Sequence, residues 1–372
     1  MADKFAALLR DCPPPPSAYQ PAHPVLIYGA GCAGRGMVEH LKARGVVIAG
    51  FLDAKARPGQ YIAGIPVSTL PEWLSRNDPS HYEVFIAIAN PAFLPQIPEL
   101  RQQIAAQGFA QCVHHPRKMC WAIISNTLPR HVENFRQYYE QFLPELARLD
   151  ALLADEESRQ CLMAYIRANC REEPVQDYSP ADQYRPASLP AWPQPLRFVD
   201  GGAFNGDTII DFRQHGHRFE AIAAFEPDPE NFRHLVLNTA SCENLIRFPC
   251  ALGDKTQVLR FDANGSMGSH IAGEGKGGSI SVQCVSLDEV LPDFRPNLIK
   301  MDIEGAEPEA LMGAKNMIVR HRPHLAICLY HRPEHPWRIP FLIQEWDPGY
   351  RFYIRQHAPL LDLVLYAYPD KS

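Results

Sequence analysis

The chain has 372 residues, 46% of them hydrophobic and 21% charged, and its formal net charge is -6 at pH 7. This length suits two domains and a connector better than one core, and the acidic balance argues against sequence-independent binding to nucleic acid, which needs a basic surface. No apolar run approaches a membrane span of about 18 residues, and no cleavable signal is expected before the fold.

The ten cysteines are scattered through the chain without a C-x-x-C pair. Such a distribution is typical of small buried side chains in a reducing compartment, and it favours neither disulfides nor zinc. We therefore expect a cytoplasmic protein without a structural metal.

Residues 1–23 are predicted to be a leader or a docking arm. A short amphipathic segment from Phe5 to Leu9 precedes four consecutive prolines at 13–16. Because proline has no backbone N–H and clashes with the preceding turn, a helix cannot continue through them.

A first domain is predicted over residues 24–116. An apolar strand at 25–28 runs into Gly29, Gly31 and Gly34, which form a G-x-G-x-x-G pattern before a helix, and a second strand at 46–52 ends at Asp53. This order is that of a Rossmann-like unit, in which the glycines expose a helix N-terminus to a diphosphate and the acid binds ribose hydroxyls. A Rossmann-like scaffold that binds nothing is the alternative.

The rest of this domain resembles the sugar-nucleotide-binding domain found at the front of bacterial sugar acyltransferases. The resemblance covers the segment 64–67, a helix at 70–74, a strand at 84–89 and Asn90-Pro91. It implies a nucleotide sugar or NAD as the ligand of the glycine loop.

Residues 117–190 are predicted to form a helical connector and then a linker. Five prolines between residues 179 and 195 oppose both helix and sheet, so we expect this stretch to separate the two domains. The connector shows apolar residues at helical spacing, namely Phe135, Tyr138, Tyr139, Phe142, Leu146, Leu149, Leu153, Leu162, Tyr165 and Ile166.

A second domain is predicted over residues 191–372, and it begins with an apolar strand that ends at Asp200 before a glycine loop at 201–206. An acid at the head of such a loop would repel a pyrophosphate and attract a cation. S-adenosylmethionine carries a sulfonium and an ammonium and no phosphate, so it suits this loop better than NAD. A glycine turn that only connects two elements is the alternative.

Two further strand ends extend the predicted cofactor site. The strand at 221–225 ends at Glu226 and Pro227, about 20 residues after the loop, where an acid can accept hydrogen bonds from ribose hydroxyls. Ala251 follows the next strand, at a position where an adenine edge would meet the backbone.

A third buried strand, at 297–301, is followed by Asp302, Glu304 and Glu307. Asp302 is expected in the crevice at the carboxyl ends of the strands, where open sheets bind ligands. Glu304 is either a general base or a cap of the helix that Pro308 helps to begin. Lys300 is expected to form an ion pair with a neighbouring acid.

These segments resemble the FkbM-type S-adenosylmethionine-dependent methyltransferases. The matching sequences are VDGGAFNGDT from Val199, FEPDPENFRHL from Phe225, SLDEVL from Ser286, LIKMDIEGAEPEALMGA from Leu298 and LAICLYHRPEHPWRIP from Leu325. The resemblance implies an α/β protein: after the Rossmann-like parallel sheet comes a class I methyltransferase domain, with a seven-stranded sheet and an antiparallel last hairpin at 350–355 and 361–367. The cofactor site would comprise Asp200, Gly202, Ala203, Phe204, Asn205, Gly206, Glu226, Pro227, Ala251 and Asp302.

Methyl transfer to a hydroxyl needs in-line positioning and a general base, because a free alcohol is a weak nucleophile. The candidates are Asp302, Glu304 and His331, and the resemblance implies that His331 lies beside the acceptor as base or hydrogen-bond donor. His331 also begins an H-x-x-E-H sequence, but prolines at 333, 336 and 340 argue against the helix that a zinc peptidase needs.

Six glycines between residues 264 and 279 predict a mobile lid over the acceptor, with a disordered hairpin tip as the alternative.

The sequence therefore predicts an S-adenosylmethionine-dependent O-methyltransferase that acts on a hydroxyl of a sugar or another polar metabolite. The acceptor class follows from the resemblance alone. One alternative is a sugar-nucleotide-binding regulatory or scaffold protein whose methyltransferase half is inert, against which Asp200, Glu226 and Asp302 argue. Another is an NAD-dependent oxidoreductase, but no catalytic Tyr-Lys or His-acid pair is evident near the first glycine loop.

Overall fold

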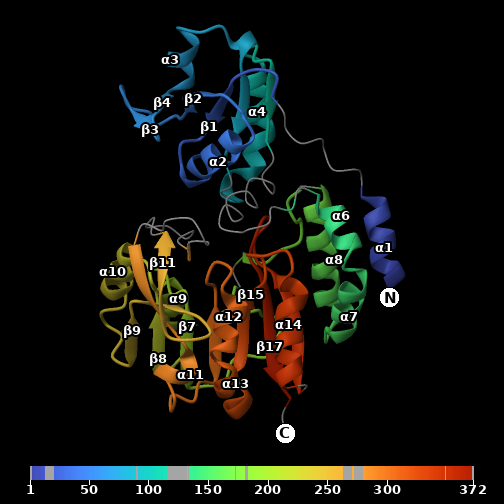
Figure 1. The fold of residues 1–372 in the computed structure, drawn as a ribbon, viewed down its shortest axis with the longest axis vertical. Helices are drawn as coiled ribbons and strands as arrows, with labels where there is room; N and C mark the ends of the chain where they lie inside the picture. The colour runs from blue at the N-terminus through green and yellow to red at the C-terminus, as the bar shows by residue number, and fades with distance from the viewer. Residues whose placement is uncertain are drawn as a thin grey trace. The chain divides into compact units, whose positions relative to one another are not determined.

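The computed structural model describes residues 2–12, 21–88, 91–114, 132, 134–171, 173–180, 183–262, 270–271, 280–347 and 349–370. The expected lid at 264–279 lies outside them, apart from residues 270–271. The chain divides into two compact units (Figure 1). We call Ala7–Gln141 with Ile166–Gln176 the N-terminal unit, and Met1–Ala6, Phe142–Tyr165 and Asp177–Ser372 the C-terminal unit.

The N-terminal unit contains a six-stranded sheet in the order β3-β4-β2-β1-β5-β6. All pairs are parallel except β3 with β4, which confirms the Rossmann-like prediction. The strands are β1 (Val25–Tyr28), β2 (Ile48–Leu52), β3 (Tyr61–Ile62), β4 (Ile65–Ser68), β5 (Glu83–Ile86) and β6 (Gln111–Val113). The helices are α2 (Cys32–Ala43), α3 (Leu70–Leu74), α4 (Ile97–Ala105) and the short 3-10 turns Pro79–His81 and Pro91–Gln96.

The side chains of β1 alternate between the two faces of this sheet, and each face carries a hydrophobic core. Val25 and Ile27 belong to one buried cluster, which includes Met37 and Val38 of α2. Leu26 belongs to another, with Trp73 of α3. Because successive side chains of a strand point to opposite faces, a continuous apolar strand requires helices on both sides.

The predicted connector forms helices α6 (Phe135–Glu140), α7 (Leu143–Leu152) and α8 (Glu156–Arg171), and the segment predicted to be a leader or a docking arm contains α1 (Ala2–Asp11). Within the C-terminal unit, the first turn of α8 is joined to the sheet by a buried arginine. Arg355 Nη2 lies 2.6 Å from Asp155 Oδ2, and Arg355 Nη1 donates to Ser158 Oγ at 2.8 Å. The beginning of α8 is therefore part of this unit's structure.

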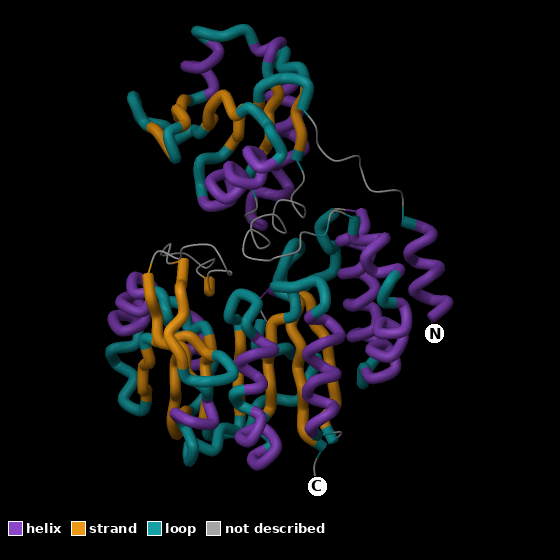
Figure 2. The backbone as a smooth tube through the Cα atoms, viewed as in Figure 1, coloured by secondary structure: helices purple, strands orange, loops and turns teal. Residues whose placement is uncertain are grey.

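The C-terminal unit contains a seven-stranded sheet in the order β16-β17-β15-β14-β7-β8-β9, with helices beside it (Figure 2). Its last hairpin is antiparallel and the other pairs apart from β15 with β17 are parallel, as expected for a class I methyltransferase. The strands are β7 (Leu196–Gly201), β8 (Phe219–Phe225), β9 (Leu245–Phe248), β14 (Leu298–Met301), β15 (His324–Cys328), β16 (Tyr350–Gln356) and β17 (Leu363–Pro369).

A second sheet in this unit was not predicted. It has the order β10-β13-β11-β12, with β10 (Cys250–Leu252), β11 (Gln257–Asp262), β12 (His270–Ile271) and β13 (Ile280–Val285). The helices of the unit are α9 (Asp207–Gln214), α10 (Pro229–Asn238), α11 (Leu287–Val290), α12 (Glu307–Met312), α13 (Lys315–His321) and α14 (His335–Trp346).

A buried ion pair joins the central strands β7 and β14, as the sequence predicted for Lys300. Lys300 stands opposite Asp200 in the parallel register, and its Nζ lies 3.0 Å from Asp200 Oδ1. The two residues are 3% and 0% exposed. Burial raises the pKa of Asp200 to about 6, although Lys300 opposes the shift. Lys300 Nζ also donates to Gly202 O at 2.7 Å, so the pair holds the glycine loop as well as the two strands.

We expect Lys300→Met to lower the free energy of unfolding of the C-terminal unit by about 3–5 kcal/mol, because it leaves the Asp200 carboxylate buried without a counter-ion. Urea unfolding followed by the fluorescence of the buried Trp192 would measure it. The double variant Asp200→Asn, Lys300→Met should recover part of the loss, and the exposed control Lys255→Met should stay within about 0.5 kcal/mol of wild type. A wild-type midpoint for Lys300→Met would contradict the role of the pair.

Candidate active site

The loop after β7 turns sharply because two glycines have left-handed backbone conformations. Gly202 has φ +73° and Gly206, the N-cap of α9, has φ +87°. A Cβ on Gly202 would lie 1.9 Å from Asp302 O, so a side chain there would collide with the residue after β14. The N–H groups of Gly202 and Ala203 both donate to Phe225 O, which fixes the loop against the end of β8.

Glu226 is held at the end of β8 by two backbone amides. Its Oε2 accepts from Phe204 N and its Oε1 from Asp228 N, each at 2.9 Å. Burial raises the pKa of Glu226 to about 7, although both amide bonds oppose the shift. Each carboxylate oxygen keeps another lone pair, so this carboxylate can still accept hydrogen bonds from ribose hydroxyls.

Asp200 lies below the loop and not at its surface. Its side chain is fully buried and paired with Lys300, which in turn binds Gly202 O. It therefore acts on the loop through Lys300, and its direct contact with a cofactor stays a prediction. Ala251 lies on β10, where its side chain packs in a small core with Val282 and Cys284. The predicted adenine contact there also stays a prediction.

Asp302 adjoins the glycine loop, because Asp302 N donates to Gly201 O at 3.0 Å. Its side chain is 25% exposed. Two tyrosine hydroxyls donate to its carboxylate, Tyr184 to Oδ2 and Tyr330 to Oδ1, each at 3.0 Å. The structure thus brings the glycine loop, Glu226 and Asp302 to one edge of the sheet, the carboxyl ends of β7, β8 and β14.

His331 is fully buried after β15, between acids on both sides of its ring. Its Nδ1 lies 2.7 Å from Glu307 Oε1, while its Nε2 lies 3.4 Å from Asp302 Oδ1 and 3.6 Å from Glu304 Oε2. Burial lowers the pKa of His331, but Glu307 and then Glu304 outweigh it and raise the pKa to about 10. The imidazole is therefore protonated near neutral pH, which favours the donor role over the base role.

The carboxylate of Glu307 accepts the hydrogen bonds of backbone amides just before α12. Its Oε1 accepts from Ile303 N at 2.9 Å and from Gly305 N at 3.5 Å, so these amides bond to Glu307 and not to Glu304. Burial opposes ionisation of Glu307, but His331 outweighs it and lowers the pKa to about 2. Glu304 has φ +56° and its side chain is 24% exposed. Strained backbone of this kind is common at functional sites.

The H-x-x-E-H sequence is not on one helix, because α14 begins only at His335. Two of the three prolines nevertheless do not oppose a helix as predicted, since Pro336 and Pro340 both lie within α14. Pro336 occupies the first turn, where a backbone N–H has no helical partner. Pro340 has no backbone N–H to donate to the carbonyl of residue 336, so α14 lacks that one helical hydrogen bond. Over the residues that the structure describes, no group of three or more His, Cys, Asp or Glu side chains is arranged to hold a metal ion.

In the N-terminal unit, Asp53 binds the glycine loop in the way that Glu226 binds the loop after β7. Asp53 Oδ2 accepts from Ala30 N and Asp53 Oδ1 from Lys55 N, each at 2.8 Å. A Cβ on Gly34 would lie 1.9 Å from Gly29 O, so Gly34 is needed for packing. Gly31 differs, because it has φ -73° and a Cβ there would meet nothing within 4 Å.

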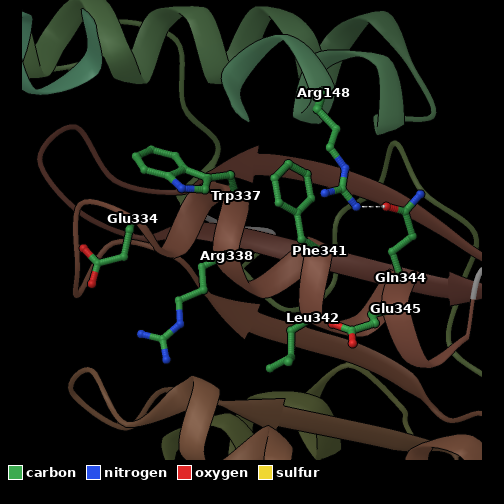
Figure 3. A pocket seen from close by; sticks show the side chains of 8 residues that line it. All are labelled: Arg148, Glu334, Trp337, Arg338, Phe341, Leu342, Gln344 and Glu345. Atoms are coloured by element: carbon green, nitrogen blue, oxygen red, sulfur yellow. Dashed lines mark hydrogen bonds between the residues drawn. The ribbon is translucent and has the colours of Figure 1, made fainter. Parts of the chain in front are cut away.

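A surface hollow of about 890 Å³ lies on α14 and the neighbouring α7 (Figure 3). Arg148 of α7 lies 3.9 Å from the ring centroid of Phe341 and donates to Gln344 Oε1. None of the predicted site residues lines this hollow. In the described part of the chain, no helix is long and apolar enough to cross a membrane.

Two family models match the chain in the expected places. Residues 200–352 match the methyltransferase FkbM domain, and residues 24–99 match the PglD N-terminal domain. Both matches confirm the resemblances drawn from the sequence. FkbM methyltransferases use S-adenosylmethionine, which is the cofactor predicted from the loop after β7.

Among solved structures, the methyltransferase FkbM from Methylobacillus flagellatus KT is similar over 98% of both chains, with 21% sequence identity and a TM-score of 0.71. This similarity shows a shared fold. PerB from Caulobacter crescentus, solved in complex with CoA and GDP-perosamine, is similar over 25% of this chain and 42% of its own, with 25% identity and a TM-score of 0.20. No curated protein matches the chain.

Proposed function

We propose that the protein transfers the methyl group of S-adenosylmethionine to a hydroxyl oxygen of a sugar or another polar metabolite. The observation that supports this most is the cluster of two acids, Asp302 and Glu304, with His331, which lies directly beside the glycine loop of the FkbM domain. A general base and a cofactor loop are thereby within reach of one acceptor atom, as O-methylation requires.

The residues around the loop fit the proposed cofactor. Glu226 has lone pairs left for ribose hydroxyls, and the partly exposed carboxylate of Asp302 after β14 attracts a cation. Gly202 and Gly206 let the loop turn tightly beside these acids, because a Cβ would lie 1.9 Å from Asp302 O at Gly202 and 2.6 Å from Thr239 Cγ2 at Gly206. When bound, S-adenosylmethionine supplies an electrophilic methyl group and leaves as S-adenosylhomocysteine.

Each site residue then has a different role toward the acceptor. Asp302 accepts a hydrogen bond from a neighbouring hydroxyl of the acceptor and so orients it, while Glu304 takes the proton of the reacting hydroxyl as the new O–C bond forms and the S–C bond breaks. The positive charge of His331, 3.4 Å from Asp302 and 3.6 Å from Glu304, stabilises both carboxylates in this arrangement. Glu307 keeps the His331 ring in place.

We expect Glu226→Gln to weaken the binding of both S-adenosylmethionine and S-adenosylhomocysteine by about 1–3 kcal/mol, because a charged acceptor of the ribose hydroxyls is lost. Isothermal titration calorimetry would measure this. Glu230→Gln removes an exposed carboxylate in the first turn of α10 and should bind both compounds like wild type. Wild-type affinity in Glu226→Gln would contradict the assignment.

We expect turnover to rise as the pH rises through about 8, because burial raises the pKa of Glu304 to about 8 against the opposing effect of His331, and a base must be unprotonated. Glu304→Gln should lower turnover by about 10²- to 10⁴-fold and remove this rise. The matched control Glu309→Gln, on the exposed face of α12, should keep the wild-type profile. An unchanged rise in Glu304→Gln would assign the base elsewhere.

We propose further that the N-terminal unit binds a nucleotide sugar through its glycine loop. The match to the PglD N-terminal domain supports this, since such domains resemble those of nucleotide-sugar-binding acetyltransferases. The fold itself does not require Gly31, because its φ suits any residue and the space beside it is open. A diphosphate at the N-terminus of α2 would account for a glycine there.

We expect Gly31→Val to abolish binding of a diphosphate ligand to the full-length chain without lowering its melting temperature, because a Cβ there has no protein atom within 4 Å while the valine fills the ligand's space. Titration with UDP- and GDP-sugars, NAD and NADP would measure this, with NADP weakest because Asp53 repels a 2′-phosphate. Ala43→Val, at the exposed far end of α2, is the control. Equal binding by wild type and Gly31→Val, or no binding of any compound, would contradict the proposal.

A further inference from the structure

Tyr184 comes from the proline-rich segment that the sequence predicted to be a linker, yet it lies in the centre of the acidic site. Its side chain is buried, and its hydroxyl donates to Asp302 Oδ2 at 3.0 Å and lies 3.3 Å from Cys328 Sγ. Its ring faces the ion pair below the loop, with Lys300 Nζ 5.4 Å from the ring centroid. One side chain therefore contacts both the carboxylate beside the acceptor and the lysine that holds Gly202.

The backbone of Tyr184 is held on both sides by buried side chains. Its N–H donates to Tyr366 Oη at 2.9 Å, and its carbonyl accepts from Trp192 Nε1 at 2.6 Å. Tyr366 Oη in turn lies 2.8 Å from His357 Nε2. These contacts maintain a φ of +62°, a left-handed conformation that is costly for a tyrosine. A simple spacer between domains would need neither the strain nor the anchors.

The two tyrosines on Asp302 remain hydrogen-bond donors across the neutral range. Burial, and then the charge of Asp302, raises the pKa of both Tyr184 and Tyr330 well above its usual value. Oδ2 of Asp302 thus accepts from Tyr184, while Oδ1 accepts from Tyr330 and also lies 3.4 Å from His331 Nε2, so Oδ2 keeps a lone pair for a further donor. Because both oxygens are held, the orientation of the carboxylate is fixed.

We propose that Tyr184 is a positioning residue of the methyl-transfer site, whose hydroxyl holds the Asp302 carboxylate in the orientation that receives a hydroxyl of the acceptor beside the reacting one. This inference rests on the proposed function. It makes Tyr184 of the proline-rich segment part of the methyltransferase site, where it acts through Asp302 without touching the methyl group.

The test compares Tyr184→Phe with wild type in methyl transfer from S-adenosylmethionine to a panel of UDP-, GDP- and dTDP-sugars and free monosaccharides. We expect kcat to fall by about 10- to 100-fold, because small displacements of a positioning group are costly. The dissociation constant of S-adenosylhomocysteine should change by less than about twofold, since the ring that faces Lys300 is retained. In the Asp302→Asn background, Tyr184→Phe should lower kcat by less than about twofold more, because the group through which it acts is gone.

Tyr368→Phe is the matched control. Its hydroxyl donates to Pro190 O at 2.8 Å, in the same proline-rich segment but away from Asp302, so its kcat should stay within about twofold of wild type. If Tyr368→Phe loses as much activity as Tyr184→Phe, or if the losses from Tyr184→Phe and Asp302→Asn multiply, Tyr184 has only a structural role. If wild type methylates no member of the panel, the proposed function fails instead, and this inference with it.

Discussion

The site depends on one buried ion pair, Lys300 with Asp200, between the central strands β7 and β14. Two charges removed from water are tolerated only if each finds a partner at short range. Asp200 meets this need from the neighbouring strand, and Gly202 O takes a further hydrogen bond from the ammonium group. The parallel register that places Lys300 opposite Asp200 also places Asp302 beside the glycine loop.

Around this ion pair, at the carboxyl ends of the strands, carboxylates outnumber cations. Among the described residues, Asp200, Asp302, Glu304, Glu307 and Asp362 interact with Lys300 and His331. His335 adds no positive charge, because burial lowers its pKa to about 3. An edge with this balance attracts a cationic cofactor. Burial, and then the charges of Asp302 and Glu307, raise the pKa of Glu304 to about 8 against the opposing effect of His331, which is near the value a general base requires at neutral pH.

The parts of the site that follow from local sequence could be predicted. Residues close together in the sequence determine these parts. They are the strand that ends in an acid and then glycines, the second strand that ends at Glu226, and Lys300 two residues before Asp302. The seven-stranded sheet followed from the family resemblance and is confirmed by the strand order.

The parts that depend on long-range packing were missed. Tyr184 reaches Asp302 across 118 residues of sequence, and its segment was interpreted as a linker because prolines oppose regular structure. Prolines do not prevent a segment from being ordered by side chains such as Trp192 and Tyr366. The pairing of Glu307 with His331 was missed for the same reason, since no pattern in either segment marks the other as its partner.

The most direct test of the account is the chemical position of the transferred methyl group. Full-length protein would be incubated with S-adenosylmethionine labelled with ¹³C in its methyl group and with the sugar and nucleotide-sugar panel, and the products would be analysed by NMR and mass spectrometry. We expect a labelled methyl group on a hydroxyl oxygen of one member of the panel, together with S-adenosylhomocysteine. Label found on nitrogen or carbon, or label that remains entirely in S-adenosylmethionine, would contradict it.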